Sequence, residues 1–136
     1  MKNSKAYLNE LTYKINGAAI EVHKELGTGL LENVYQKCLA HELQNRNIEI
    51  QTEKIISIDF KGLELDVNLK CDLPVEDTIC IELKAVKEII PVYEAQILSY
   101  MKLLKVPKGT LFNFNVYNLY NEGQKTFVNE YFSNMI

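Results

Sequence analysis

The chain has 136 residues, of which 47% are apolar and 24% charged, and it carries a formal net charge of −3 at pH 7 with a pI near 5.4. This length and composition predict one soluble globular domain, residues 1–136, with a single hydrophobic core. No stretch approaches the roughly 20 apolar residues of a membrane span, and the acidic balance argues against a protein that coats nucleic acid through a basic surface.

The N-terminus and the cysteines bear on the compartment. Residues 1–10, MKNSKAYLNE, lack the apolar segment of a secretory signal peptide. Cys38, Cys71 and Cys80 are odd in number and show no spacing typical of a disulfide framework or a zinc site. These features predict a reducing environment, and we expect the protein in the cytoplasm.

Two helices are predicted in the first third of the chain. Apolar residues three and four positions apart indicate an amphipathic helix over residues 8–26, which Gly27-Thr28-Gly29 ends. A second apolar stripe, from Leu31 to Leu43, predicts another helix with Glu32 in its first turn. The helix dipole favours a carboxylate there by about 0.3–1 kcal/mol, so Glu32 by itself needs no functional explanation.

Three consecutive strands are predicted next. Residues 48–60 alternate in polarity, and Lys61-Gly62 then turns the chain. Residues 67–86 hold two further alternating runs around Pro74-Val75-Glu76-Asp77, which indicates a β-hairpin. Because consecutive strands usually pair, the simplest arrangement is an antiparallel meander.

The last third of the chain predicts a helix and a strand. Pro91 suits the first position of a helix that runs to about Lys105. Residues 110–117, TLFNFNVY, are rich in strand formers and predict a buried strand, and residues 126–132 could add an edge strand. The predicted order of the core elements is therefore α-α-β-β-β-α-β.

The polar face of the predicted hairpin carries the first candidate site. Asp72, Glu82 and Lys84 lie opposite the apolar rows of the two strands, because side chains alternate along a strand. With the turn centred near Glu76, Lys70 would face Glu82, and Asp72 would lie diagonally, at roughly 7–8 Å. Two carboxylates at this spacing can share a divalent cation. A Lys70–Glu82 ion pair on an ordinary polar face is the alternative explanation.

Four motifs in this order resemble one family. Gly29-Leu-Leu-Glu32-Asn-Val-Tyr35 matches the motif of the GxxExxY proteins, small members of the PD-(D/E)xK nuclease superfamily. Asp72 and Glu82-Leu83-Lys84 match the carboxylate and the E-x-K tripeptide of that superfamily. The resemblance covers residues 8–116, with Pro74 as a minor departure from the pattern.

The other two motifs lie further along the chain. Gln96 and Tyr100 are similar to the Q-x-x-x-Y helix motif of the RecB-type branch, and Asn113-Phe114 to a pair on the last core strand. Taken alone, Gln96 and Tyr100 are equally well explained as polar residues on a helix surface. Tyr35 lies on the apolar stripe and is expected in the core, with its hydroxyl touching the site.

The resemblance implies an α/β fold, a restriction-endonuclease-like PD-(D/E)xK core with a central mixed sheet flanked by helices. It implies that Asp72, Glu82 and the Leu83 carbonyl ligate Mg²⁺ or Mn²⁺. Such hard cations prefer oxygen ligands, and no histidine or thiolate cluster is present that would suit zinc. Glu32 would face the metal from the opposite side and hold a water or a second ion.

The resemblance also implies the roles of the remaining candidates. Lys84 would orient the attacking water or stabilise the transition state, and Gln96 and Tyr100 would hydrogen-bond this lysine or the substrate backbone. The function expected first is a metal-dependent nuclease that hydrolyses phosphodiester bonds in nucleic acid, with DNA as the substrate. The second is a nuclease-fold module that binds nucleic acid or a protein partner without cutting. The third is that the carboxylates only solvate the sheet.

The acidic pI and the lack of a separate DNA-reading segment leave room for a protein partner that delivers the substrate.

Overall fold

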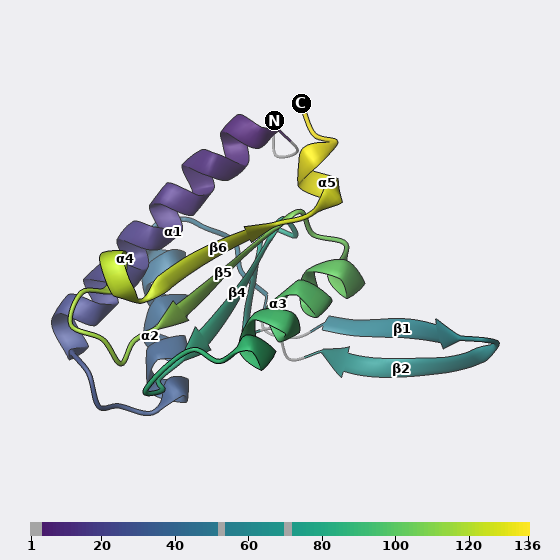
Figure 1. Cartoon of the computed structure of the whole chain (residues 1–136). Helices are drawn as coiled ribbons and strands as arrows, with labels where there is room; N and C mark the ends of the chain where they lie inside the picture. Colours follow the sequence, from purple (N-terminus) through teal and green to yellow (C-terminus); the bar gives the residue numbers. More distant parts are fainter. Residues whose placement is uncertain (1–3, 52–53, 70–71) are drawn as a thin grey trace.

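The computed structural model describes residues 4–51, 54–69 and 72–136 (Figure 1). Its longer helices confirm the predicted ones to within three residues at each end. The described elements, in chain order, are α1 (Lys5–Leu26), α2 (Glu32–Asn45), β1 (Lys54–Phe60), β2 (Leu63–Leu69), β3 (Leu73–Val75), β4 (Ile79–Lys84), α3 (Pro91–Leu104), β5 (Lys108–Asn113), α4 (Leu119–Glu122), β6 (Gln124–Val128) and α5 (Glu130–Ser133).

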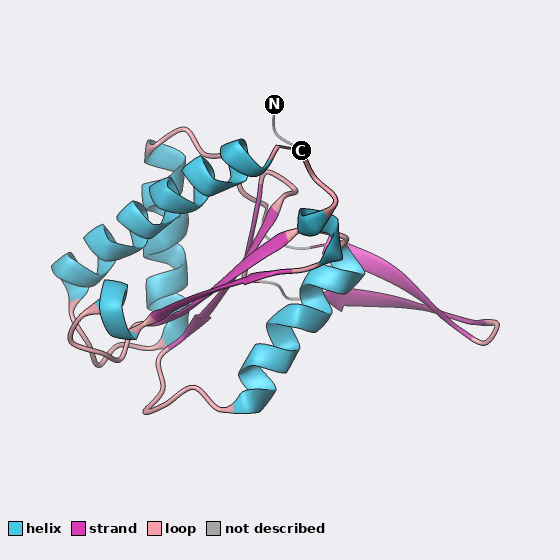
Figure 2. Ribbon diagram, turned by 45° about the horizontal axis from the view of Figure 1, so that its top comes forward, coloured by secondary structure: helices cyan, strands magenta, loops and turns pink. Residues whose placement is uncertain are grey.

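A four-stranded mixed sheet forms the centre of the molecule, in the order β3-β4-β5-β6. β4 and β5 are parallel and joined through α3, whereas β3 and β6 run antiparallel to their neighbours at the two edges. Helices α1 and α2 cover one face of the sheet, and α3 covers the other (Figure 2). The predicted mixed sheet flanked by helices is confirmed.

Strand β4 is buried on both faces. Ile81 and Leu83 point into the core formed with α1 and α2, whereas Cys80 packs under α3. A strand covered on both sides is apolar at nearly every position, which explains the run Ile79 to Leu83 with Glu82 as its exception. On β5, Gly109 lets α3 approach closely, since a Cβ there would lie 2.7 Å from the Met101 sulfur.

The predicted three-stranded meander is wrong. In the described part of the chain β1 and β2 pair with each other as a separate two-stranded sheet, which we call the ribbon, and it projects from the body (Figure 1). It is β3 that pairs with β4, so the alternating run that begins at Val67 is divided between two sheets. The predicted strand 48–60 is divided likewise: Ile50 bridges to Val75 on the outer edge of β3, and β1 begins only at Lys54.

The ribbon is amphipathic. Opposed residues share a face, so one face is apolar and the other carries Ser57, Asp59, Glu64 and Asp66. On the apolar face Phe60 is 61% exposed. The residues of this apolar face, apart from the ends of the ribbon, are Ile56, Ile58, Phe60, Leu63, Leu65 and Val67.

The hairpin turn is tighter than predicted, and the register moves with it. Glu76 and Asp77 both have positive φ, 50° and 56°, which is the signature of a two-residue type I′ turn, and Thr78 N–H donates to the Val75 carbonyl at 2.9 Å. Pro74 therefore lies in β3 rather than in the turn. Leu73 pairs with Ile81, so the predicted register was off by two residues; Lys70 lies outside the described residues.

The C-terminal region adds short elements to the sheet. Strand β5 ends at Asn113, four residues before the predicted end, and β6 confirms the predicted edge strand for its first residues. The single-turn helices α4 and α5 were not predicted, and the side chains of Asn118 and Asn129 cap them. Within the described ranges, no helix combines the length and the apolar character needed to cross a membrane.

Candidate active site

The short strand β3 opens the edge of β4 where the candidate residues lie. The β3–β4 ladder ends at the Leu73–Ile81 pair, whereas β4 continues to Lys84. Instead of a β3 carbonyl, the Leu83 N–H meets the Asp72 carboxylate, to whose Oδ2 it donates at 2.8 Å. The Asp72 N–H in turn donates to Glu82 Oε1 at 3.3 Å. These two bonds hold the carboxylates side by side, Asp72 opposite Glu82.

A cavity of about 280 Å³ lies at this open edge, and we call it the acidic cavity. It receives side chains from both layers of the fold, because α2 reaches it from one face of the sheet and α3 from the other. Its described lining residues are the seven predicted site residues and Gln36, which was not predicted: Glu32, Gln36, Asp72, Glu82, Leu83, Lys84, Gln96 and Tyr100.

Burial dominates the electrostatics of the two central carboxyl groups. Glu82 is 4% exposed, and its burial, followed by the nearby charge of Asp72, raises its pKa to about 8. Burial also raises the pKa of Asp72, against the opposing effect of the Leu83 N–H and of Lys84. A buried carboxyl pair of this kind is poorly neutralised by one lysine, so it suits a site that a cation completes.

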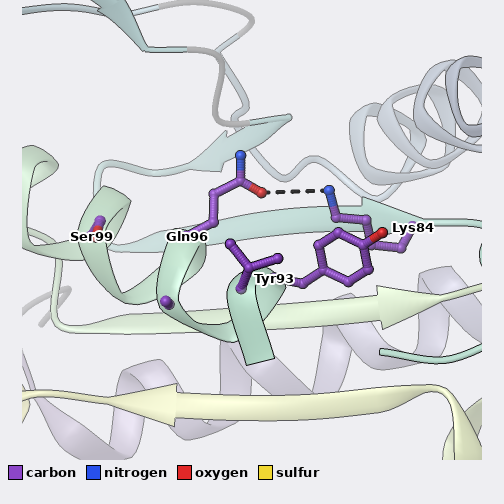
Figure 3. A pocket seen from close by; sticks show the side chains of 6 residues that line it. Lys84, Tyr93, Gln96 and Ser99 are labelled. Atoms are coloured by element: carbon purple, nitrogen blue, oxygen red, sulfur yellow. Dashed lines mark hydrogen bonds between the residues drawn. The ribbon is translucent and has the colours of Figure 1, made fainter. Parts of the chain in front are cut away.

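Lys84 is tied to α3 by a chain of two hydrogen bonds. Its Nζ donates to Gln96 Oε1 at 3.4 Å (Figure 3), and Gln96 Nε2 donates to the Tyr100 hydroxyl at 3.0 Å. Positions 96 and 100 lie one helical turn apart and so share a face of α3. Gln96 thus contacts the lysine directly, and Tyr100 is linked to it through Gln96. Polar residues that only faced solvent, the alternative explanation, would not need to form these bonds.

Gln36 and Tyr93 belong to the site region but were not predicted. Gln36 Nε2 donates to the Asp72 carbonyl at 3.0 Å, and its position four residues after Glu32 puts both on one face of α2. Tyr93 lies three residues before Gln96, and its ring centroid is 4.6 Å from Lys84 Nζ. Helical spacing from the motif residues was the signal that could have identified both.

Tyr35 fixes the loop that leads to Glu32. Its hydroxyl donates to the Gly27 carbonyl at 2.7 Å and accepts the Leu30 N–H at 3.3 Å, so these bonds go to the loop and not to the acidic residues. Its buried ring stacks on Phe114 with centroids 4.5 Å apart, which confirms its expected place in the core. Gly29 has φ of +96°, a conformation that glycine adopts readily.

Asn113 holds the chain segment that follows Lys84. Its Oδ1 accepts the Val86 N–H at 3.1 Å, and its Nδ2 donates to the Val86 carbonyl at 3.0 Å. The Phe114 N–H donates to the Lys84 carbonyl at 2.9 Å. The Asn113-Phe114 pair thus sets the backbone on which the lysine stands.

The donor set of the acidic cavity suits a hard divalent cation. The N–H and C=O of one residue leave a strand on the same side, so the Leu83 carbonyl faces the side of Asp72. Two carboxylates and a carbonyl are the ligands that Mg²⁺ and Mn²⁺ prefer. Among the described residues no three acidic, histidine or cysteine side chains converge closely enough to enclose an ion, so a cation here would keep part of its water shell.

Comparison with known families decides the assignment. A family model described as the PD-(D/E)XK nuclease superfamily matches residues 9–126. The chain belongs to this superfamily. Membership of the PD-(D/E)XK superfamily, whose members are generally nucleases, agrees with a mixed sheet that carries its acidic residues at one open edge.

A similar fold is seen in a solved structure titled "Crystal structure of SSO0001". The two superpose with a TM-score of 0.55 at 17% sequence identity, over 71% of this chain and 50% of that one. This chain thus spans about half the length of that protein, and the likeness concerns the fold. No curated protein has significant sequence similarity to the chain.

Proposed function

We propose that this protein is a metal-dependent nuclease that hydrolyses phosphodiester bonds in nucleic acid, with DNA as its substrate. The observation that carries the proposal is the meeting of Asp72, Glu82 and Lys84 in one cavity of a chain from a nuclease superfamily. The Gly29–Tyr35 motif supports a place among the GxxExxY members of that superfamily.

Asp72, Glu82 and the Leu83 carbonyl are the proposed ligands of Mg²⁺ or Mn²⁺. Glu32 lines the cavity from the first turn of α2 and would hold a water or a second ion from that side. A divalent cation, when bound, supplies a water of lowered pKa and offsets negative charge on the phosphate. The ionised carboxylates of Asp72 and Glu82 would hold the divalent cation in place, whereas the neutral amides of asparagine and glutamine at these positions would not.

Lys84 is the proposed electrostatic group of the reaction. Its ammonium ends in the cavity beside the carboxylates, where it would stabilise the charge that develops on the phosphate. Gln96 accepts a hydrogen bond from it, and Tyr100 accepts one from Gln96, so α3 positions the ammonium. We propose that both α3 residues act on the lysine or on the substrate backbone.

The test compares cleavage by the wild type, Lys84→Ala and Glu32→Ala on single-stranded DNA, double-stranded DNA and RNA, with Mn²⁺ or with EDTA. We expect Lys84→Ala to lower the rate about 10²–10³-fold while leaving Mn²⁺ affinity nearly unchanged, because its charge acts in the transition state. Lys84→Arg should not restore the rate, since a planar guanidinium does not replace a compact ammonium. Lys87→Ala, an exposed lysine that does not line the cavity, is the matched control.

Metal binding is measured in parallel by isothermal titration. Mn²⁺ should bind the wild type more tightly than Mg²⁺ does, and the Asp72→Asn, Glu82→Gln double variant should bind neither. Equal, EDTA-sensitive cleavage by the wild type and Lys84→Ala would contradict the role of the lysine. Binding of oligonucleotides without any cleavage would favour the second candidate, a silent binding module, for which the acidic net charge of −3 is the argument.

A further inference from the structure

A second hollow adjoins the acidic cavity and shares Lys84 and Gln96 with it. This hollow, which we call the α3 pocket, has a volume of about 480 Å³, within the range of roughly 300–1,000 Å³ that is typical of small-ligand sites. Its other lining residues are Val92, Tyr93, Ala95 and Ser99 (Figure 3).

The surface of α3 is hollowed because of the residues on one helix face. Positions 92, 95, 96 and 99 follow the spacing of neighbours on a helix, and alanine and serine are small. Val92 is 61% exposed, so an apolar surface is open to solvent beside a polar edge. Tyr93 stands at the wall next to the Lys84 ammonium, as Figure 3 shows.

This combination matches a nucleobase better than a second phosphate. A base has flat apolar faces and a polar edge, and bases stack on aromatic and apolar side chains irrespective of sequence. The lining offers Tyr93, Val92 and Ala95 to the faces, and the Gln96 amide and the Ser99 hydroxyl to the edge. Among the described lining residues Lys84 is the one cation, and it is shared with the acidic cavity, so these residues offer no separate charge for another phosphate.

We propose that the α3 pocket binds an unpaired base of the nucleic acid whose phosphate occupies the acidic cavity, so that single strands are preferred. The inference rests on the proposed function, because the acidic cavity supplies the neighbouring phosphate site. A paired base is stacked inside its duplex, and only an unpaired or extruded base can enter a side pocket. The shared residues Lys84 and Gln96 make the two sites adjacent parts of one strand's path.

The experiment measures equilibrium binding by fluorescence anisotropy with Ca²⁺ in place of Mn²⁺. The probes are an oligothymidylate about a dozen nucleotides long, an abasic oligomer of equal length and charge, and a blunt duplex. We expect the wild type to bind oligothymidylate about tenfold more tightly than the abasic oligomer, the scale of one stacked base. The duplex should bind no better than the abasic oligomer.

Filling the pocket should remove this preference. Ala95→Leu and Ser99→Leu place a larger side chain at exposed helix positions, where leucine is a good helix former, so folding should be kept. Each should lower oligothymidylate affinity to that of the abasic oligomer and leave abasic binding unchanged. Ala6→Leu, an exposed alanine on α1 that lines neither hollow, is the matched control.

The outcomes separate this inference from the nuclease proposal. Equal affinity for the two oligomers in the wild type, no binding of either, or an unchanged preference in both pocket variants overturns the base pocket, whether or not cleavage occurs. A preference that Ala95→Leu abolishes supports the pocket even if no substrate is cut, in which case the nuclease proposal alone fails.

Discussion

Asp72 and Glu82 are costly residues for the fold when no cation is bound. Glu82 is buried near the end of β4, and Asp72 lies just before β3. The Asp72 carboxylate accepts the Leu83 N–H, and the Glu82 carboxylate accepts the Asp72 N–H. Burial disfavours the charged form of both, and the two negative charges would also repel each other. Near neutral pH the cation-free protein therefore favours protonated Glu82, and ionising Glu82 lowers the free energy of unfolding.

The pH dependence of stability follows from the pKa of Glu82. It is about 8 in the folded protein and 4.5 as the ordinary value, so between these pH values the folded state binds more protons than the unfolded one. The contribution of Glu82 is fully present below about pH 4.5 and is lost as the pH rises to about 8. In EDTA, the free energy of urea unfolding should fall from pH 5 to pH 8 more steeply in the wild type than in Glu82→Gln.

Manganese provides the control for this prediction. Because a bound cation favours the ionised carboxylates, Mn²⁺ should stabilise the wild type increasingly as the pH rises and should leave Glu82→Gln nearly unaffected. A constant difference between the two proteins across this range in EDTA would show that Glu82 is already ionised in the folded protein.

At the scale of elements, the site depends on loops held by single side chains. The loop between α1 and α2 is closed by the Tyr35 hydroxyl, and the segment after β4 is closed by the Asn113 amide. The Tyr35 ring stacks on Phe114 in the core, and Asn113 directly precedes Phe114 in the chain. Glu32 and Lys84 are thus presented by backbone that the core fixes from two sides.

Removing the Tyr35 hydroxyl should loosen the first of these loops. Tyr35→Phe loses hydrogen bonds to Gly27 and Leu30, and a bond of this kind contributes about 0.5–1.5 kcal/mol to folding. We expect a loss of about 1–2 kcal/mol in urea unfolding, with faster amide exchange near Leu30 and an intact stack on Phe114. Tyr13→Phe, at a position 79% exposed on α1, should change neither measurement. Equal stability of both variants would mean that water replaces the two bonds without cost.

Local patterns predicted the helices, and the family resemblance named the candidate residues that line the acidic cavity. Non-local strand pairing was beyond both. The periodicity of α1, α2 and α3 depends on neighbours within a few residues, so it is visible in the sequence. The register of β3 on β4 depends on a type I′ turn at Glu76-Asp77, a pair without the glycine or asparagine that marks most such turns. Asp72 therefore lies opposite Glu82, and not diagonal to it.

The separation of the ribbon from the sheet could not be predicted for a similar reason. The pattern of residues 48–60 and 63–69 fits a strand in either sheet, whereas the strand that pairs with β4 is the short run Leu73–Val75. Gln36 and Tyr93 were missed because neither belongs to a motif. Their distance from Glu32 and Gln96 along a helix shows why they meet the same cavities.

For the whole molecule, the acidic cavity lies where the layers of the fold come together, and the α3 pocket adjoins it. Helix α2 contributes side chains from one face of the sheet and α3 from the other. Because β3 begins only at Leu73, opposite Ile81, both helices can reach the end of β4. A change in the packing of α3 on β5, for instance at Gly109, would move Gln96 and the α3 pocket together. The position of the Lys84 ammonium and the shape of the α3 pocket therefore both depend on how α3 packs on β5.

The ribbon should unfold locally more often than the central sheet does. Among the described residues its ladder bonds join β1 to β2 and to no other strand, whereas β4 is bonded on both sides within the four-stranded sheet and packed on both faces. Segments with few buried contacts open far more often than the global unfolding free energy would allow. In hydrogen–deuterium exchange, amides of Ile56 to Phe60 should exchange orders of magnitude faster than those of β4, and denaturant should accelerate β4 much more.

Limited proteolysis tests the same difference in local stability between the ribbon and the central sheet. Trypsin should cut first at Lys61, the exposed tip of the ribbon, and the nicked protein should keep the thermal transition of its central sheet. Exchange of ribbon amides as slow as that of β4 would contradict this ordering, since protection of that kind requires the ribbon to unfold only together with the core.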